Sequence, residues 1–179
     1  MQTRTVSIFM TRYHDILSNF LYHIIGRGYT HVAIAFDDDS QNFYCFNYKG
    51  FRREHPFRRK RRYGKSICYK LDVNEEQHAA LQGIIEQMEA SNIEWKYCML
   101  GVILCLLGIR HKMKNAYFCS QFVAELLQRS EIMKWRKHPS LYLPNQLCRE
   151  IRAHSGLRET IEFESIEVID ENGEKIEIC

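Results

Sequence analysis

The chain has 179 residues, of which 45% are hydrophobic and 12% aromatic. This length and composition predict a single domain over residues 1–179 with a sizeable core, and they exclude a disordered or low-complexity protein. The net charge is only +3, but residues 1–70 carry 13 Lys and Arg against 5 Asp and Glu, so the positive charge is concentrated in the first part of the chain.

Strands and helices alternate irregularly along the chain. Apolar and β-branched runs predict strands at 5–10, 31–36, 43–48 and 66–71, and an apolar face at helical spacing predicts a helix over about 16–25. A capping box of Asn74 and Gln77 predicts the start of a helix at 75–90. Further helices are predicted at 97–107, at 119–129, and from Pro144 to about residue 154. Because these elements show no regular βαβ alternation, the predicted class is α+β.

The C-terminal segment is acidic and carries a turn signal. Glu171-Asn172-Gly173 separates 160–169 from 174–179, which predicts a hairpin at the periphery of the domain. Its exposed edges make an oligomer through residues 160–179 an option.

The longest apolar stretch covers residues 97–109, which is 13 residues against the roughly 20 that cross a bilayer. We interpret it as a buried helix, with a helix that dips into a membrane surface as the alternative. The first ten residues have too short an apolar run for a signal peptide, so a cytoplasmic protein is expected.

The seven cysteines do not form a disulfide pattern, because their number is odd and their spacings are wide. Free thiols in a reducing compartment are expected instead. The sequence has no Cys-x-x-Cys pair and no His-x-x-x-His spacing, so neither a metal nor another cofactor is expected.

Residues 52–62 form a basic segment with seven Lys and Arg among eleven residues. One interpretation is a solvated connection between strands. The other is an anion-binding surface near a cleft, for a phospholipid headgroup or an acidic peptide, with Arg58 and Arg59 as substrate contacts. Nucleic acid is the least favoured partner, because aromatic residues are not interleaved for base stacking.

Cys119 is the cysteine that most clearly begins a helix. Apolar residues recur at 122, 123, 126 and 127, so a helix with one buried face follows it. Unpaired N–H groups and the positive end of the helix dipole favour the thiolate, which is the nucleophile. His31 begins a strand directly after a Gly-containing loop and is the best-placed base, while Cys45 lies mid-strand without a helix dipole.

Residues 29–35, Tyr-Thr-His-Val-Ala-Ile-Ala, and residues 117–127, Tyr-Phe-Cys-Ser-Gln-Phe-Val-Ala-Glu-Leu-Leu, resemble the circularly permuted, amidase-like branch of the bacterial NlpC-type papain-like superfamily. In that branch the histidine strand precedes the cysteine helix, the reverse of the order in papain, and the same order occurs here. Residues 139–145 are also similar to members from Gram-positive bacteria. The resemblance covers roughly residues 5–150.

The resemblance implies a papain-like fold, in which an antiparallel sheet packs against the helix that bears the cysteine. It also implies that Cys119 is the nucleophile and an oxyanion donor through its backbone N–H, and that His31 is the general base. Counting along the next strand places the third residue, which orients the histidine, at Asn47, although related branches often have glutamate. Asn47 as a turn residue is the alternative. Tyr29 and Tyr117 flank the motifs and are candidates to line the cleft, with aromatic packing as the alternative.

These observations predict a thiol-dependent hydrolase or acyltransferase that forms a cysteine acyl-thioester from an amide or ester. The expected substrate is a small peptide, an amide or a lipid. The alternative is a binding module without catalysis on the same scaffold, which contacts an anionic membrane surface through residues 52–62.

Overall fold

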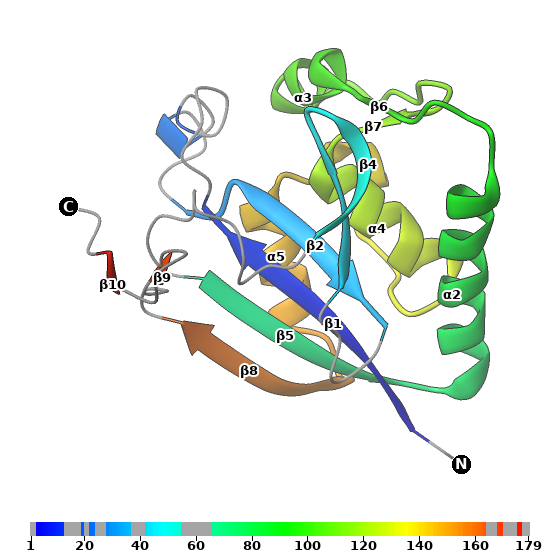
Figure 1. Cartoon of the computed structure of the whole chain (residues 1–179), viewed down its shortest axis with the longest axis vertical. Coiled ribbons are helices and arrows are strands. Elements are labelled where there is room, and N and C mark those ends of the chain that lie inside the picture. The colour runs from blue at the N-terminus through cyan, green and yellow to red at the C-terminus, as the bar shows by residue number, and fades with distance from the viewer. Residues whose placement is uncertain are drawn as a thin grey trace.

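A six-stranded sheet forms the centre of the computed structural model, which describes residues 3–12, 19, 22–23, 28–36, 42–54, 66–163, 168–169 and 175–176 (Figure 1). Its strands are β1 (Arg4–Thr11), β2 (His31–Ala35), β3 (Phe43–Asn47), β4 (Gly50–Glu54), β5 (Ser66–Val73) and β8 (Leu157–Phe163). They lie in the order β4-β3-β2-β1-β5-β8, and every neighbouring pair is antiparallel. The predicted antiparallel sheet and the α+β class are confirmed.

The helices are α2 (Glu75–Ala90), α3 (Met99–Leu106), α4 (Cys119–Arg129) and α5 (Pro144–Arg152), with a short 3-10 helix, η1 (Pro139–Leu141). The predicted capping box is confirmed, because the Asn74 side chain accepts the Gln77 N–H at 2.8 Å and the Gln77 side chain accepts the Asn74 N–H at 3.1 Å. The helices predicted at 75–90, 97–107, 119–129 and 144–154 are all present. The helix predicted at 16–25 lies almost entirely outside the described residues.

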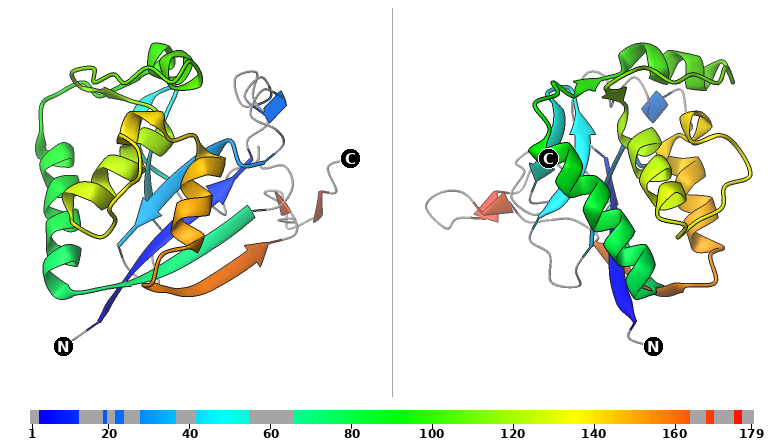
Figure 2. Two further views of the ribbon diagram at one scale, coloured as in Figure 1. Left: turned by 180° about the vertical axis from the view of Figure 1, so that it is seen from behind. Right: turned by 90° about the vertical axis from the view of Figure 1, so that its right-hand side faces the viewer.

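The two faces of the sheet pack against different surroundings. On one face, Ile8, Val32 and Ile34 join the main core with residues of α2, α4 and α5, and Figure 2 shows these helices on the same side of the sheet. On the other face, Phe9 and Cys45 belong to a second apolar cluster. The alternation of side chains along a strand produces this division, since neighbouring residues point to opposite faces.

The start of the basic segment is a strand and not only a connection, which corrects the first interpretation of residues 52–62. Strand β4 (Gly50–Glu54) pairs with β3 from Phe43 opposite Glu54 to Asn47 opposite Gly50. Its charged residues hid it in the sequence, yet charged side chains are usual on an edge strand, where they deter pairing with other chains. Residues 55–62 lie outside the described residues.

The helix expected within residues 97–109 is present, but it is buried on one side only, so the expectation that it is a buried helix is wrong for its other side. Gly101, Val102 and Cys105 face inward, toward Phe118 and Leu143. The large apolar side chains on the other side are exposed, and Leu100, Ile103 and Leu107 retain 52%, 48% and 67% of their surface. Figure 1 shows α3 at one end of the molecule.

Short pairings complete the fold. β6 (Lys96–Tyr97) and β7 (Ala116–Tyr117) form a parallel pair, which is too short for a periodic pattern to predict. The predicted C-terminal hairpin is divided: β8 joins the main sheet beside β5, and β9 (Val168–Ile169) pairs with β10 (Lys175–Ile176).

The six cysteines in the described part of the chain are free thiols. No helix within the same residues has both the length and the apolar character needed to cross a bilayer.

Candidate functional site

Cys119 is the first residue of α4 and is 4% exposed. The preceding residue, Phe118, offers no side-chain cap, and the first turn contains no acidic residue. The thiol therefore lies beside the backbone N–H groups of this turn, at the positive end of the helix dipole.

The Cys119 sulfur lies 3.9 Å from the carbonyl oxygen of Thr30 and is positioned to donate its proton there. Thr30 directly precedes His31, so the fold brings the cysteine of α4 to the start of the histidine strand. The two segments are separated by 89 positions in the sequence. The structure thus places the two predicted motifs side by side.

The His31 ring is held by a glutamate that the sequence did not single out. His31 Nε2 lies 2.9 Å from Glu54 Oε1, and both side chains are largely buried, with 5% and 10% of their surface exposed. A carboxylate in this position fixes the orientation of the ring and stabilises the imidazolium that forms when the ring accepts a proton.

Cys45 lies beside the same ring on the neighbouring strand and is completely buried. Burial raises the pKa of the Cys45 thiol to about 11, and the hydrogen bond to His31 offsets only part of this effect. Cys45 is therefore a neutral thiol near pH 7, and its mid-strand position offers it no helix terminus. These properties describe a partner of the ring and not an activated nucleophile.

Strand alternation separates Cys119 from the ring. His31 has the same parity along β2 as Ala33 and Ala35, which belong to the second cluster with Cys45. Cys119 instead packs in the main core with Val32 and Ile34. The ring and the sulfur therefore approach the first residue of β2 from different faces, and a hydrogen bond between them requires the ring to turn around the beginning of the strand.

Asn47 has the geometry of a turn residue, which was the alternative to a catalytic role. It ends β3, and its side-chain oxygen accepts the backbone N–H of Lys49 at 2.9 Å, which is the hydrogen bond of a turn. The His31 ring bonds the side chain of Glu54. The tight turn after residues 43–47 is the sequence signal that could have identified β4, because a returning strand places residue 54 opposite Phe43.

Gly50 makes this hairpin possible. Its φ is +85°, and a Cβ added here would lie 1.9 Å from the backbone carbonyl oxygen of Trp95. Only glycine avoids both the strained backbone and this overlap. The glycine therefore fixes how β4, and with it Glu54, returns to the sheet.

The two predicted cleft tyrosines are partly buried in packing contacts. Tyr29 donates its backbone N–H to Asn145 Oδ1 at 2.8 Å, and burial raises the pKa of its hydroxyl. Tyr117 packs against Phe46 and Phe122, and burial raises its pKa to about 12. Arg58 and Arg59 lie outside the described residues.

Two further polar residues in the first turn of α4 each have a buried oxygen atom without a hydrogen bond to the described part of the chain. Ser120 Oγ and Gln121 Oε1 are buried and find no hydrogen-bond partner among the residues that the structure describes. Buried polar atoms are normally paired, and a catalytic role is one of the explanations for such exceptions. Only their position next to Cys119 could have pointed to them in the sequence.

Three donor atoms of different kinds meet around His31. Ligand atoms of His31, Cys45 and Glu54 all lie within 4.8 Å of one another, and this set of nitrogen, sulfur and oxygen suits zinc. The sequence contained no motif for this group, because its members come from three different strands.

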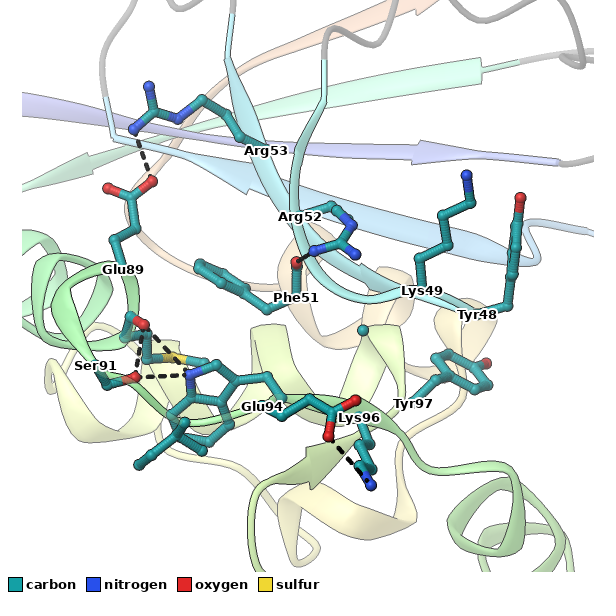
Figure 3. A pocket seen from close by; sticks show the side chains of 14 residues that line it. Tyr48, Lys49, Phe51, Arg52, Arg53, Glu89, Ser91, Glu94, Lys96 and Tyr97 are labelled. Carbon is teal, nitrogen blue, oxygen red and sulfur yellow. Dashed lines mark hydrogen bonds and ion pairs between the residues drawn. The ribbon is translucent and has the colours of Figure 1, made fainter.

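The groove beside β4 has a volume of about 840 Å³ (Figure 3). Its wall carries charges of both signs, with Arg53 paired to Glu89 at 2.6 Å and Lys96 to Glu94 at 3.4 Å. Its size suits a small ligand or a short peptide. Neither Cys119 nor His31 lines it.

Searches with protein-family models and against curated proteins found no match for this chain.

Proposed function

We propose that the protein is a thiol-dependent hydrolase or acyltransferase, with Cys119 as nucleophile and His31 as general base. The sulfur attacks the carbonyl carbon of an amide or ester. His31, after its ring has turned around the beginning of β2 toward the sulfur, takes the thiol proton and later gives it to the leaving group. Water, or another acceptor, then releases the acyl group from the thioester.

One observation supports this proposal most strongly. The thiol of a helix-starting cysteine contacts the backbone at Thr30, next to a buried histidine that is held by a carboxylate. A cysteine at a helix N-terminus, a histidine and an orienting acid are the three parts that cysteine nucleophiles require. Glu54 takes the orienting role in this proposal, in place of Asn47.

The oxyanion that forms during attack needs hydrogen-bond donors. In the proposed site the uncapped backbone N–H groups of the first turn of α4, starting with that of Cys119, provide them. The scaffold is proposed to be papain-like and circularly permuted, with the histidine strand β2 before the cysteine helix α4.

The experiment is labelling of the purified protein with an electrophilic, thiol-directed activity probe, followed by mass spectrometry of the modified peptide. We expect Cys119 to react fastest near neutral pH, and Cys119→Ala to abolish this reaction. Cys45→Ala is the matched control, because it removes a buried thiol next to the same ring and leaves Cys119 in place. If labelling is lost in Cys45→Ala and retained in Cys119→Ala, the reactive thiol is Cys45, and the proposal that Cys119 is the nucleophile is wrong.

The histidine and the glutamate are tested by the rate of the same reaction. His31→Ala should slow labelling of Cys119 by about 10²-fold or more, in the range of general-base catalysis. Glu54→Gln keeps a hydrogen-bond acceptor but removes the charge, so a smaller loss, about tenfold, is expected. An unchanged rate in both variants contradicts the pairing of Cys119 with His31.

A further inference from the structure

The exposed side of α3 and the residues after it carry six of the eight large apolar side chains that are exposed on the described part of the chain. We define the α3 patch as Met99, Leu100, Ile103, Leu107, Ile109 and Met113, whose exposed fractions run from 39% to 67%. Single exposed apolar residues are common, but six large ones within residues 99–113 indicate an interaction surface.

The patch is held rigidly. Cys98 caps the first turn of α3 by accepting the Gly101 N–H at 3.1 Å, and its sulfur lies 3.0 Å from that of Met113. The His111 ring stacks near Phe118 and fills the space beside Gly101. The segment that follows α3 is therefore packed against the start of the helix.

Cations border the patch. Arg110, Lys112 and Lys114 alternate with His111 and Met113, and all three are exposed. Lys112 is paired with Glu125 at 3.1 Å, whereas Arg110 and Lys114 have no ion pair among the described residues. Lys137 also lies near α3, because its charge acts on the Cys105 thiol. The border of the patch is thus positive.

We propose that the α3 patch docks the protein on the surface of an anionic membrane. The apolar side chains enter the boundary between headgroups and acyl chains, while the bordering cations contact lipid phosphates. The eight residues of α3 span only about 12 Å, so the helix lies at the interface and does not cross the bilayer. Figures 1 and 2 show α3 at one end of the molecule.

Charge favours a membrane over a second copy of the chain. A two-fold dimer through this patch places the same surface on both partners, so Arg110 and Lys114 of each copy face a positive border. Like charges across an interface oppose binding, whereas anionic headgroups neutralise them. This inference is independent of the proposed chemistry at Cys119.

The test is flotation of the full chain with vesicles of phosphatidylcholine, with and without phosphatidylglycerol. We expect binding to the anionic vesicles and weaker binding as sodium chloride is raised. Replacing Leu100, Ile103 and Leu107 by serine should reduce the partition coefficient by about fivefold to tenfold for each side chain. The variant Ile93→Ser is the matched control, because Ile93 is 42% exposed but lies in the groove beside β4.

The cations are tested separately. Arg110→Ser with Lys114→Ser should weaken binding to anionic vesicles by about fivefold per charge, whereas Arg149→Ser on α5 should not. All replaced side chains are exposed, so the unfolding midpoint checks that each variant remains folded. Absence of flotation, flotation that persists in the triple serine variant, or dimerisation that depends on the patch without vesicle binding would each overturn the proposal.

Discussion

Replacing Gly50 by alanine tests the hairpin that carries Glu54 to His31. The backbone of Gly50 has a φ of +85°, which costs an L-residue about 1–2 kcal/mol. The added Cβ also lies 1.9 Å from the Trp95 carbonyl oxygen, and this atom belongs to the backbone and cannot rotate away. Relieving the overlap requires the turn or the segment at Trp95 to move, at a further cost of about 1–3 kcal/mol, as for overpacked sites.

The matched control is Gly108→Ala. Gly108 also has a positive φ, of +72°, but a Cβ added there meets no atom within 4 Å. It therefore carries only the backbone cost. Gly50→Ala should destabilise the chain by about 2–5 kcal/mol, and Gly108→Ala by about 1–2 kcal/mol.

The assay is equilibrium unfolding in urea, followed by the fluorescence of the two tryptophans, one of which is Trp95 itself. The same variant should also slow labelling of Cys119, because a displaced β4 carries Glu54 away from His31. If both alanine variants lose the same free energy of unfolding, the close approach of Gly50 to Trp95 does not constrain the fold, and the reasoning fails.

Three other outcomes are expected. Burial raises the pKa of the Cys45 thiol from 9.0 to about 11, so between these pH values the folded chain keeps a proton that the unfolded chain releases. The free energy of unfolding should therefore fall by up to about 2–3 kcal/mol between pH 9 and pH 11, and by less in the variant Cys45→Ala. Urea unfolding at both pH values measures this difference. Zinc ions should slow labelling of Cys119 by binding His31, Cys45 and Glu54, a chelator should restore it, and Cys45→Ser should need more zinc; equal sensitivity of this variant argues against the three-residue site. Gly83→Ala in α2 should stabilise the chain by about 0.5–1 kcal/mol in thermal or urea unfolding, since the added methyl group meets nothing within 4 Å and the helix interior disfavours glycine.

Elements with a strong local pattern could be predicted from the sequence. The capping box of Asn74 and Gln77 and the apolar spacing after Cys119 each describe interactions within a few residues, and both elements occur as expected. Strand β4 could not be recognised in the same way, because an edge strand buries little and its arginines resemble a solvated loop. What made it a strand was pairing with β3, and that depends on a turn that only Gly50 allows.

The candidate site shows the same limit. Cys119 was found because a helix start changes the chemistry of a thiol locally. Glu54 was missed because its importance comes from a contact with His31, 23 residues away in the chain. The face on which the His31 ring lies was also beyond local reasoning, since the parity of β2 is decided by which residues the main core buries.

The short parallel pair β6–β7 has a mechanical consequence. Two backbone hydrogen bonds of 2.9 Å, from Lys96 N–H to the Asn115 oxygen and from Cys98 N–H to the Tyr117 oxygen, clamp the residues before α3 to those before α4. Cys98 is the cap of α3, and Tyr117 stands two positions before Cys119. A displacement of the start of α3 is therefore transmitted to the first turn of α4 through the hydrogen bond from Cys98 to Tyr117 and one intervening residue, Phe118. The exposed end of the molecule and the Cys119 thiol are therefore joined by a short linkage.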